Sequence, residues 1–186
     1  MNIESHQLIN QGSGDHEYYT PLAIVNAARW VMGGIDLDPA SSAAANQRVK
    51  AGFFFDKATN GLMQPWHGNV WLNHPFSRKG NRLWIEKLLE EFGEGRVDQA
   101  CVITFAATSE KWFQPLAGFT QCYLSPRTNY YLPNGKLKRG VSKGSVVSYL
   151  SAMCFECIRP GGCDAICGWL PYIWVGKGSG MTDDWL

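Results

Sequence analysis

The sequence of 186 residues contains no apolar run that approaches the roughly 20 residues needed to cross a bilayer. Its first residues are polar and lack the apolar stretch of a secretory leader. It also lacks a strong charge of either sign: 17 basic residues stand against 16 acidic ones, and the net charge is +1. A polyanionic partner must therefore be argued from a local cluster. We expect a cytoplasmic protein without a membrane partner, whose six cysteines are reduced thiols.

Apolar residues make up 45% of the chain and charged residues 18%, which is the composition of a globular protein. The length suffices for one domain with one hydrophobic core. We expect residues 1–16 to form a flexible arm, residues 17–175 to form the domain, and residues 176–186 to form a tail.

Hydrophobic periodicity predicts helices that alternate with short strands. Thr20-Pro21 is a helix start signal, and helices are expected after it and over residues 41–51, 82–92 and 111–116. Strands are expected at residues 35–39, 70–72, 100–105, 121–124 and 146–150. This alternation predicts an α/β fold built as a single-domain open sheet.

Two of the expected strands end in polar turns, and ligands of open α/β sheets bind beyond such strand ends. The first turn reads Asp36-Leu37-Asp38-Pro39-Ala40-Ser41. A carboxylate there can hold the amino group or a hydroxyl of a small ligand. The same residues are also ordinary turn and cap formers, so the segment taken alone leaves both interpretations open.

The second turn is Asn73-His74-Pro75-Phe76, directly after Val70-Trp71-Leu72. Methylating an arylamine is difficult because its lone pair is delocalised into the ring. The Asn73 side chain and the next backbone carbonyl can accept the two N–H bonds and direct the lone pair at an electrophilic methyl group, while an aromatic ring stacks on the base. A strand-terminating turn is the competing interpretation.

Taken together, the motifs resemble the phage-type DNA N6-adenine methyltransferases, the Dam-like family. The likeness runs in order over roughly residues 17–150. It includes Tyr18-Tyr19-Thr20-Pro21, the segment 34–41, Asn60-Gly61-Leu62, the segment 66–73 and Lys111-Trp112-Phe113. The resemblance implies a Rossmann-like methyltransferase fold, S-adenosylmethionine as cofactor and double-stranded DNA as substrate.

The resemblance also implies roles for individual residues. The predicted catalytic residues are Asn73, His74, Pro75 and Phe76. The predicted cofactor-binding residues are Tyr19, Thr20, Pro21, Asp36, Asp38, Ser41 and Asp56. His74 departs from the family, which has proline there; the backbone carbonyl is kept, but histidine does not stiffen its own backbone. A host cytoplasm is the expected location if the gene is carried by a phage.

A basic loop at residues 125–145 contains five cations and no acidic residue. Aromatic residues and a glycine turn lie inside it, as in a hairpin that reaches across DNA; a solvated surface hairpin is the alternative. The predicted DNA-binding residues are Arg78, Lys79, Arg127, Lys136, Lys138, Arg139 and Lys143.

Four cysteines lie close together near the end of the chain, at Cys154, Cys157, Cys163 and Cys167. Four thiolates can hold one zinc ion, but the gap between the two pairs is shorter than in zinc ribbons. Their apolar neighbours favour buried, reduced cysteines in a terminal hairpin at residues 150–175. We therefore predict no metal as the first interpretation and zinc as the alternative.

Two other functions stay open at this point. The same catalytic turn occurs in methyltransferases that act on RNA or on a protein amide, because a planar amide poses the same chemical problem. A catalytically impaired DNA-binding or cofactor-binding module is the second alternative, and His74 is the residue that suggests it.

Overall fold

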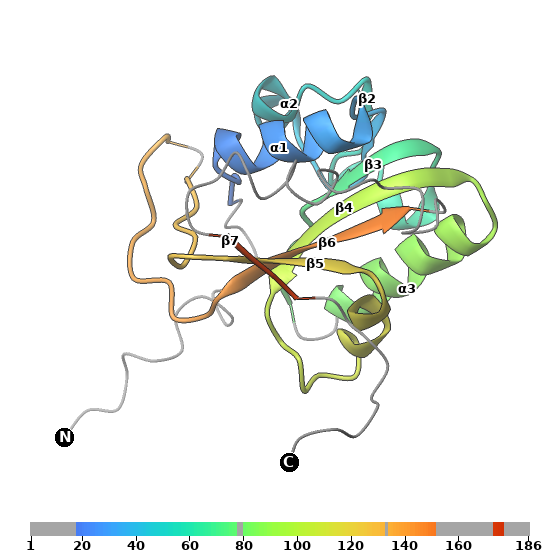
Figure 1. Ribbon diagram of the computed structural model, residues 1–186. Helices are drawn as coiled ribbons and strands as arrows, with labels where there is room; N and C mark the ends of the chain where they lie inside the picture. The colour runs from blue at the N-terminus through green and yellow to red at the C-terminus, as the bar shows by residue number, and fades with distance from the viewer. Residues whose placement is uncertain (1–17, 78–79, 133, 152–172, 177–186) are drawn as a thin grey trace, which may run out of the picture.

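A computed structural model describes residues 18–77, 80–132, 134–151 and 173–176 of the chain (Figure 1). Two of the predicted DNA-binding residues, Arg78 and Lys79, and the four C-terminal cysteines lie outside the described residues. In the described part, no helix has both the length and the apolar character that a membrane span requires.

The centre of the structure is a seven-stranded sheet with the order β2-β1-β3-β4-β6-β5-β7. Four neighbouring strands are parallel: β2 (Phe53–Phe54), β1 (Leu37–Asp38), β3 (Gly68–Leu72) and β4 (Val97–Phe105). The remaining strands continue from β4 in antiparallel pairs: β6 (Ser145–Ser151), β5 (Thr120–Leu124) and β7 (Ile173–Gly176). This mixed α/β sheet confirms the predicted Rossmann-like fold.

Helices cover both faces of the sheet, as Figure 1 shows. On one face lie α1 (Leu22–Met32) and α2 (Ala43–Val49), and on the other lies α3 (Gly80–Gly93). Side chains of a strand alternate between the faces. Trp71 of β3 and Cys101 of β4 therefore pack in the core beneath α1, while Leu72 and Val102 pack in the core beneath α3. Two short 3₁₀ helices, η1 (Gly61–Met63) and η2 (Gln114–Gly118), lie in the connections.

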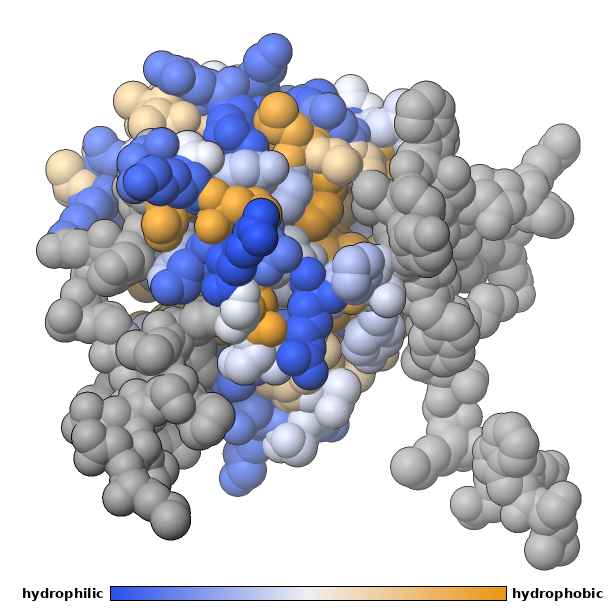
Figure 2. All heavy atoms as spheres, turned by 90° about the vertical axis from the view of Figure 1, so that its left-hand side faces the viewer, coloured by the Kyte–Doolittle hydropathy of each residue, from blue (hydrophilic) through white to orange (hydrophobic). Residues whose placement is uncertain are grey.

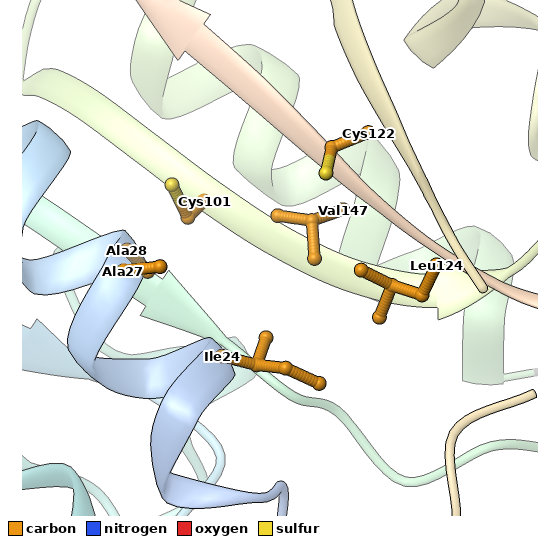
Figure 3. Close-up of a pocket in the computed structure, with 7 residues that line it drawn as sticks. All are labelled: Ile24, Ala27, Ala28, Cys101, Cys122, Leu124 and Val147. Carbon is orange, nitrogen blue, oxygen red and sulfur yellow. The ribbon is translucent and has the colours of Figure 1, made fainter. Parts of the chain in front are cut away.

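A small apolar recess lies between α1 and the antiparallel part of the sheet (Figure 3). Its lining consists of Ile24, Ala27, Ala28, Cys101, Cys122, Leu124 and Val147. The two cysteines are buried thiols, and burial raises the pKa of the Cys101 thiol above its ordinary value. Thiols that stay protonated behave as small apolar side chains. The recess is therefore part of the core packing.

The structure differs from the predicted elements in a few places. The expected strand at residues 35–39 is reduced to Leu37–Asp38, and the helix expected at residues 111–116 is a 3₁₀ helix that begins later, at Gln114. The proline that follows Gln114 fits a helix start, because proline lacks the N–H that an interior helical position needs. The predicted cysteine-rich hairpin at residues 150–175 lies largely outside the described residues.

Candidate active site

The site is organised around the two central parallel strands, β1 and β3. From β1 the chain goes to β2 on one side, and then to β3 on the other side. The order therefore reverses between β1 and β3, which is where open α/β sheets bind their ligands. Leu37 of β1 is level with Val70 of β3. The turns that follow Asp38 and Leu72, the two that the sequence singled out, thus extend from the same edge of the sheet.

Asn73 is the first residue after β3, and its side chain is half-buried. Its Nδ2 group donates a 3.0 Å hydrogen bond to the backbone carbonyl of Tyr18. This bond fixes the orientation of the amide, so that Oδ1 is the end left to accept a hydrogen bond. Tyr18 directly precedes the predicted cofactor-binding residues Tyr19, Thr20 and Pro21, and the structure therefore brings this stretch of the chain against the predicted catalytic residue.

Asp38 ends β1 and is buried, with 2% of its surface exposed. Its Oδ1 accepts a hydrogen bond from the backbone N–H of Ala40. Burial raises the pKa of this carboxyl from 3.8 to about 7, and the nearby Ser41 hydroxyl opposes the rise. Ionising a buried carboxyl costs free energy unless a partner compensates its charge. Asp38 is therefore well suited to a ligand that supplies a cation or a hydroxyl donor.

Two hydroxyls of the predicted cofactor-binding residues are buried, and neither makes a hydrogen bond of good geometry within the part of the chain that the structure describes. They are Oγ1 of Thr20 and Oγ of Ser41. A buried polar atom without a partner costs free energy. A polar ligand bound near these two hydroxyls could therefore supply the hydrogen bonds that they lack.

Gly61 explains why the Asn60-Gly61-Leu62 motif accompanies the acidic turn. A Cβ atom at position 61 would lie 1.9 Å from the carbonyl oxygen of Pro39, which no side chain can tolerate. The carbonyl of Gly61 in turn accepts a 2.7 Å hydrogen bond from the indole of Trp66. The glycine thus lets η1 pack directly against the turn that follows Asp38.

The two other predicted carboxylates lie in different places. Asp56 follows β2 at the same edge of the sheet, and it is exposed. Its Oδ1 accepts hydrogen bonds from the backbone N–H and the hydroxyl of Thr59 and from the backbone N–H of Ala58, and these bonds lower the pKa of its carboxyl. Asp36 is level with Asn69, near the amino end of β3, and its Oδ2 accepts the Asn69 N–H at 2.8 Å. The structure does not bring Asp36 together with the other site residues.

The side chain of His74 points away from the edge and into the protein, where only 1% of it is exposed. Its ring stacks on Trp84 of α3, with 6.4 Å between centroids and 8° between planes. Burial lowers the pKa of His74 from 6.5 to about 4, so the imidazole is neutral at pH 7. Phe76 is half-buried and packs against Phe105 at the carboxyl end of β4, with 4.5 Å between ring centroids.

The basic loop contacts the predicted cofactor-binding residue Tyr19 through its backbone. Tyr131 and Tyr19 exchange two backbone hydrogen bonds of 2.8 and 2.9 Å. Tyr131 also bridges Leu137, so the loop contains the expected hairpin. Figure 1 shows the loop in orange beyond the end of the sheet, and Figure 2 turns this side of the molecule, mostly hydrophilic where it is described, toward the viewer.

The predicted cations of this loop differ in their surroundings. Arg127, Lys136 and Arg139 are exposed, and Lys138 is half-buried. Lys143 lies 5.7 Å above the ring of Phe105. Since Phe105 contacts Phe76, the structure brings Lys143 close to the turn that contains Asn73.

Three residues of the site were missed in the sequence. Arg48 of α2 lies 4.8 Å from the ring centroid of Tyr131, Tyr130 packs edge-on against Phe76 at 6.1 Å, and Trp84 stacks on His74. Arg48 and Trp84 lie on helices, outside every motif. Tyr130 gave a signal only as an aromatic residue within a basic loop.

The sheet, its switch point and the two polar turns define a Rossmann-like methyltransferase fold. A sequence model of the family described as DNA N-6-adenine-methyltransferase (Dam) matches residues 9–137. The match covers more than half of the chain, which therefore belongs to the Dam family of DNA N6-adenine methyltransferases. A comparison with curated proteins found no match.

Proposed function

We propose that the protein transfers a methyl group from S-adenosylmethionine to the exocyclic amine of an adenine extruded from double-stranded DNA. The observation that carries the proposal is the hydrogen bond between Asn73 and Tyr18. It orients the Asn73 amide between the end of β3 and the stretch of chain at Tyr18 that leads into the proposed cofactor-binding residues. Membership of the Dam family supports DNA adenine as the substrate.

The residues at the carboxyl ends of β1 and β2 fit S-adenosylmethionine. The buried carboxyl of Asp38 suits a cationic amino group or a hydroxyl, and the buried hydroxyls of Thr20 and Ser41 suit further polar groups of the same ligand. Tyr19, Pro21 and Asp56 complete the proposed set. When bound, the cofactor supplies an electrophilic methyl group.

The catalytic turn acts on the target amine through two acceptors. Oδ1 of Asn73 and the backbone carbonyl of residue 74 accept the two N–H bonds and draw the nitrogen toward tetrahedral geometry. Acceptors that are already oriented before the reaction stabilise the transition state without reorganisation. The hydrogen bond to Tyr18 provides that orientation for Asn73.

An adenine inside a duplex is out of reach of this turn, so the base must leave the stack. Phe76 supports the extruded base by stacking, and Phe105 and Tyr130 hold its ring from behind. The cations of the basic loop, Arg127, Lys136, Lys138, Arg139 and Lys143, neutralise phosphates of the DNA. Arg78 and Lys79 follow the catalytic turn in sequence and join this set.

The test is to incubate the purified protein with labelled S-adenosylmethionine and with DNA, RNA or protein in parallel. The expected result is label in double-stranded DNA, which sequencing then maps to N6 of adenine. Asn73→Ala is the negative control. Transfer to RNA or protein in place of DNA would overturn the substrate, and DNA binding without transfer to any substrate would overturn the enzymatic function.

A further inference from the structure

A row of aromatic rings extends from the core beneath α3 through the proposed catalytic turn to Tyr130 and Tyr18. Its first three rings are stacked: Trp66 on Trp84 with 6.0 Å between centroids, and Trp84 on His74 with 6.4 Å. His74 then meets Phe76 edge-on at 5.5 Å. The imidazole of His74 is thus the ring that joins the catalytic turn to α3.

The imidazole of His74 also binds the turn itself. Its Nδ1 lies 3.2 Å from the backbone carbonyl oxygen of Pro75. Because a carbonyl only accepts, Nδ1 carries the proton in this contact. The other nitrogen, Nε2, is buried and has no hydrogen-bond partner among the described residues. The imidazole is therefore neutral, with its proton on Nδ1, and it makes a local hydrogen bond across the peptide group that links residues 74 and 75.

This arrangement compensates for a missing constraint. Proline at position 74 would fix its own φ through the pyrrolidine ring. Histidine does not, so the backbone carbonyl of residue 74, one of the two proposed acceptors of the amine, needs another restraint. The hydrogen bond to Pro75 and the stack on Trp84 both restrict the rotation of the His74 side chain. Because the side chain is fixed, the backbone of residue 74 is restricted as well.

We propose that Trp84 is a positioning residue of the catalytic turn, which it holds through the imidazole of His74. The inference rests on the proposed function, because it assigns Trp84 to the turn that contains Asn73. Trp84 is itself 9% exposed, and its indole also stacks with the indole of Trp66. Trp66 is held in place by its hydrogen bond to Gly61. The indole of Trp84 therefore provides a fixed surface for the imidazole.

A purely structural role makes a different prediction. If Trp84 only fills the core, its replacement lowers stability and lowers activity equally, whichever residue occupies position 74. If it positions the turn, its effect on turnover depends on residue 74. The pair Trp84→Leu and His74→Pro separates the two roles, because proline supplies its own restraint and makes the turn independent of the indole.

The experiment measures kcat and KM for DNA methylation, well below the melting temperature, in Trp84→Leu, His74→Pro and the double variant. Trp84→Leu is expected to lower kcat about tenfold or more, because small misplacements of reacting groups carry large costs, while KM for DNA changes little. In the His74→Pro background the same substitution is expected to lower kcat far less. An equal loss in both backgrounds overturns the proposal.

Two matched variants serve as controls. Trp84→Phe keeps a stacking ring and is expected to retain most of the turnover. Trp30→Leu makes the same chemical change at a tryptophan of α1 that is 61% exposed and lies outside the row of rings, and it is expected to change neither kcat nor KM. A loss in Trp84→Phe as large as in Trp84→Leu would contradict a role for the stack.

A measurement independent of activity is the protonation state of the imidazole. Long-range ¹H–¹⁵N NMR spectra of the ¹⁵N-histidine-labelled protein, with His74→Phe to assign the signal, should show His74 as the neutral ring protonated on Nδ1. In Trp84→Leu the imidazole should exchange between its two neutral tautomers, so that the observed signal is their average. An unchanged signal in Trp84→Leu, or a proton on Nε2 in the unmodified protein, overturns the proposal. Failure of the unmodified protein to methylate DNA would instead overturn the proposed function and leave this measurement valid.

Discussion

The side chain of Asn73 donates a hydrogen bond to the backbone carbonyl of Tyr18, a residue 55 positions earlier in the chain. Neither partner is a helix cap or a strand pair, so the bond has no role in regular secondary structure. It joins the end of the central strand β3 to the segment that precedes α1. Because that segment also pairs with Tyr131, one short stretch of backbone contacts both the proposed catalytic turn and the basic hairpin.

Replacing Asn73 by alanine tests whether this residue acts on the substrate or on the cofactor. Asn73→Ala removes one of the two proposed acceptors of the amine, and we expect methyl transfer to fall at least about 100-fold, the usual loss for one preorganised group. Calorimetric titration with S-adenosylmethionine should give nearly unchanged affinity. Asn26→Ala, at an exposed position of α1, should change neither quantity. An equal loss of cofactor affinity in Asn73→Ala would show that its role has been misassigned.

The second prediction concerns the close contact beneath the acidic turn. Gly61→Ala would place a methyl group against the carbonyl oxygen of Pro39, and backbone cannot move aside as a flexible side chain does. We expect the free energy of unfolding, measured in urea, to fall by about 1–3 kcal/mol, the usual cost of overpacking. Affinity for S-adenosylmethionine should fall as well, because the turn that carries Asp38 must shift. Gly118→Ala has open space around its Cβ and should be neutral in both assays.

How far the fold could be predicted depends on how far each pattern extends along the chain. The helix α3 was predicted because its apolar residues repeat over several turns. The strand β2 was not predicted, because Phe53-Phe54 is too short to show any alternation. The order in which the strands pair, with β6 between β4 and β5, depends on contacts between distant residues that no local pattern contains.

The site shows the same limit at the level of single residues. Asp36 and Asp38 belong to one motif, and the sequence does not tell them apart. In the sheet, Leu37 pairs with Val70, so that Asp36 lies on the amino side of this pair, level with Asn69, and Asp38 lies on its carboxyl side. The turn at residues 73–76 was predicted as a unit, but the direction of the His74 ring was not. A side chain in a turn follows no period, and its direction is decided by packing against Trp84.

The third prediction concerns the basic hairpin. Arg139→Ala and Lys136→Ala each remove an exposed cation, and we expect each to weaken DNA binding similarly on all sequences. The slope of log affinity against log salt should become shallower by about one for each phosphate that the variant no longer neutralises. Fluorescence anisotropy over a salt series measures both effects. Lys50→Gln changes an exposed lysine that directly follows α2, outside the basic loop, and should leave the slope unaltered; an unaltered slope in the hairpin variants would exclude phosphate binding there.

The fourth prediction follows from the buried carboxyl at the end of β1. The pKa of Asp38 is raised to about 7 by burial, and a ligand that donates to the carboxylate favours its ionised form. Below pH 7 the ligand must displace a proton, so we expect affinity for S-adenosylmethionine to rise with pH up to about 7 and then level off. Calorimetry in two buffers of different ionisation enthalpy would detect the released proton. Asp38→Asn should bind more weakly and lose this pH dependence, and a proton release that persists in Asp38→Asn would assign it to another group.

The last prediction combines two buried groups whose pKa values are shifted in opposite directions. Burial lowers the pKa of His74 from 6.5 to about 4, so between these values the unfolded chain binds the extra proton and stability rises with pH. Burial raises the pKa of Asp38 from 3.8 to about 7, so over nearly the same range the folded protein binds the extra proton and stability falls with pH. Each group alone changes the free energy of unfolding by about 1 kcal/mol per pH unit, and in the unmodified protein the two effects oppose each other.

Removing one group should therefore expose the other. Relative to the unmodified protein, Asp38→Asn should become more stable as the pH rises from 5 to 6.5, because only the His74 effect remains. His74→Phe should become less stable over the same range, because only the Asp38 effect remains. The pKa values of Asp56 and Glu91 are lowered, so these carboxylates titrate below this window and do not disturb it. Urea unfolding at several pH values measures the slopes, and two variants with the same slope would contradict opposite shifts at the two sites.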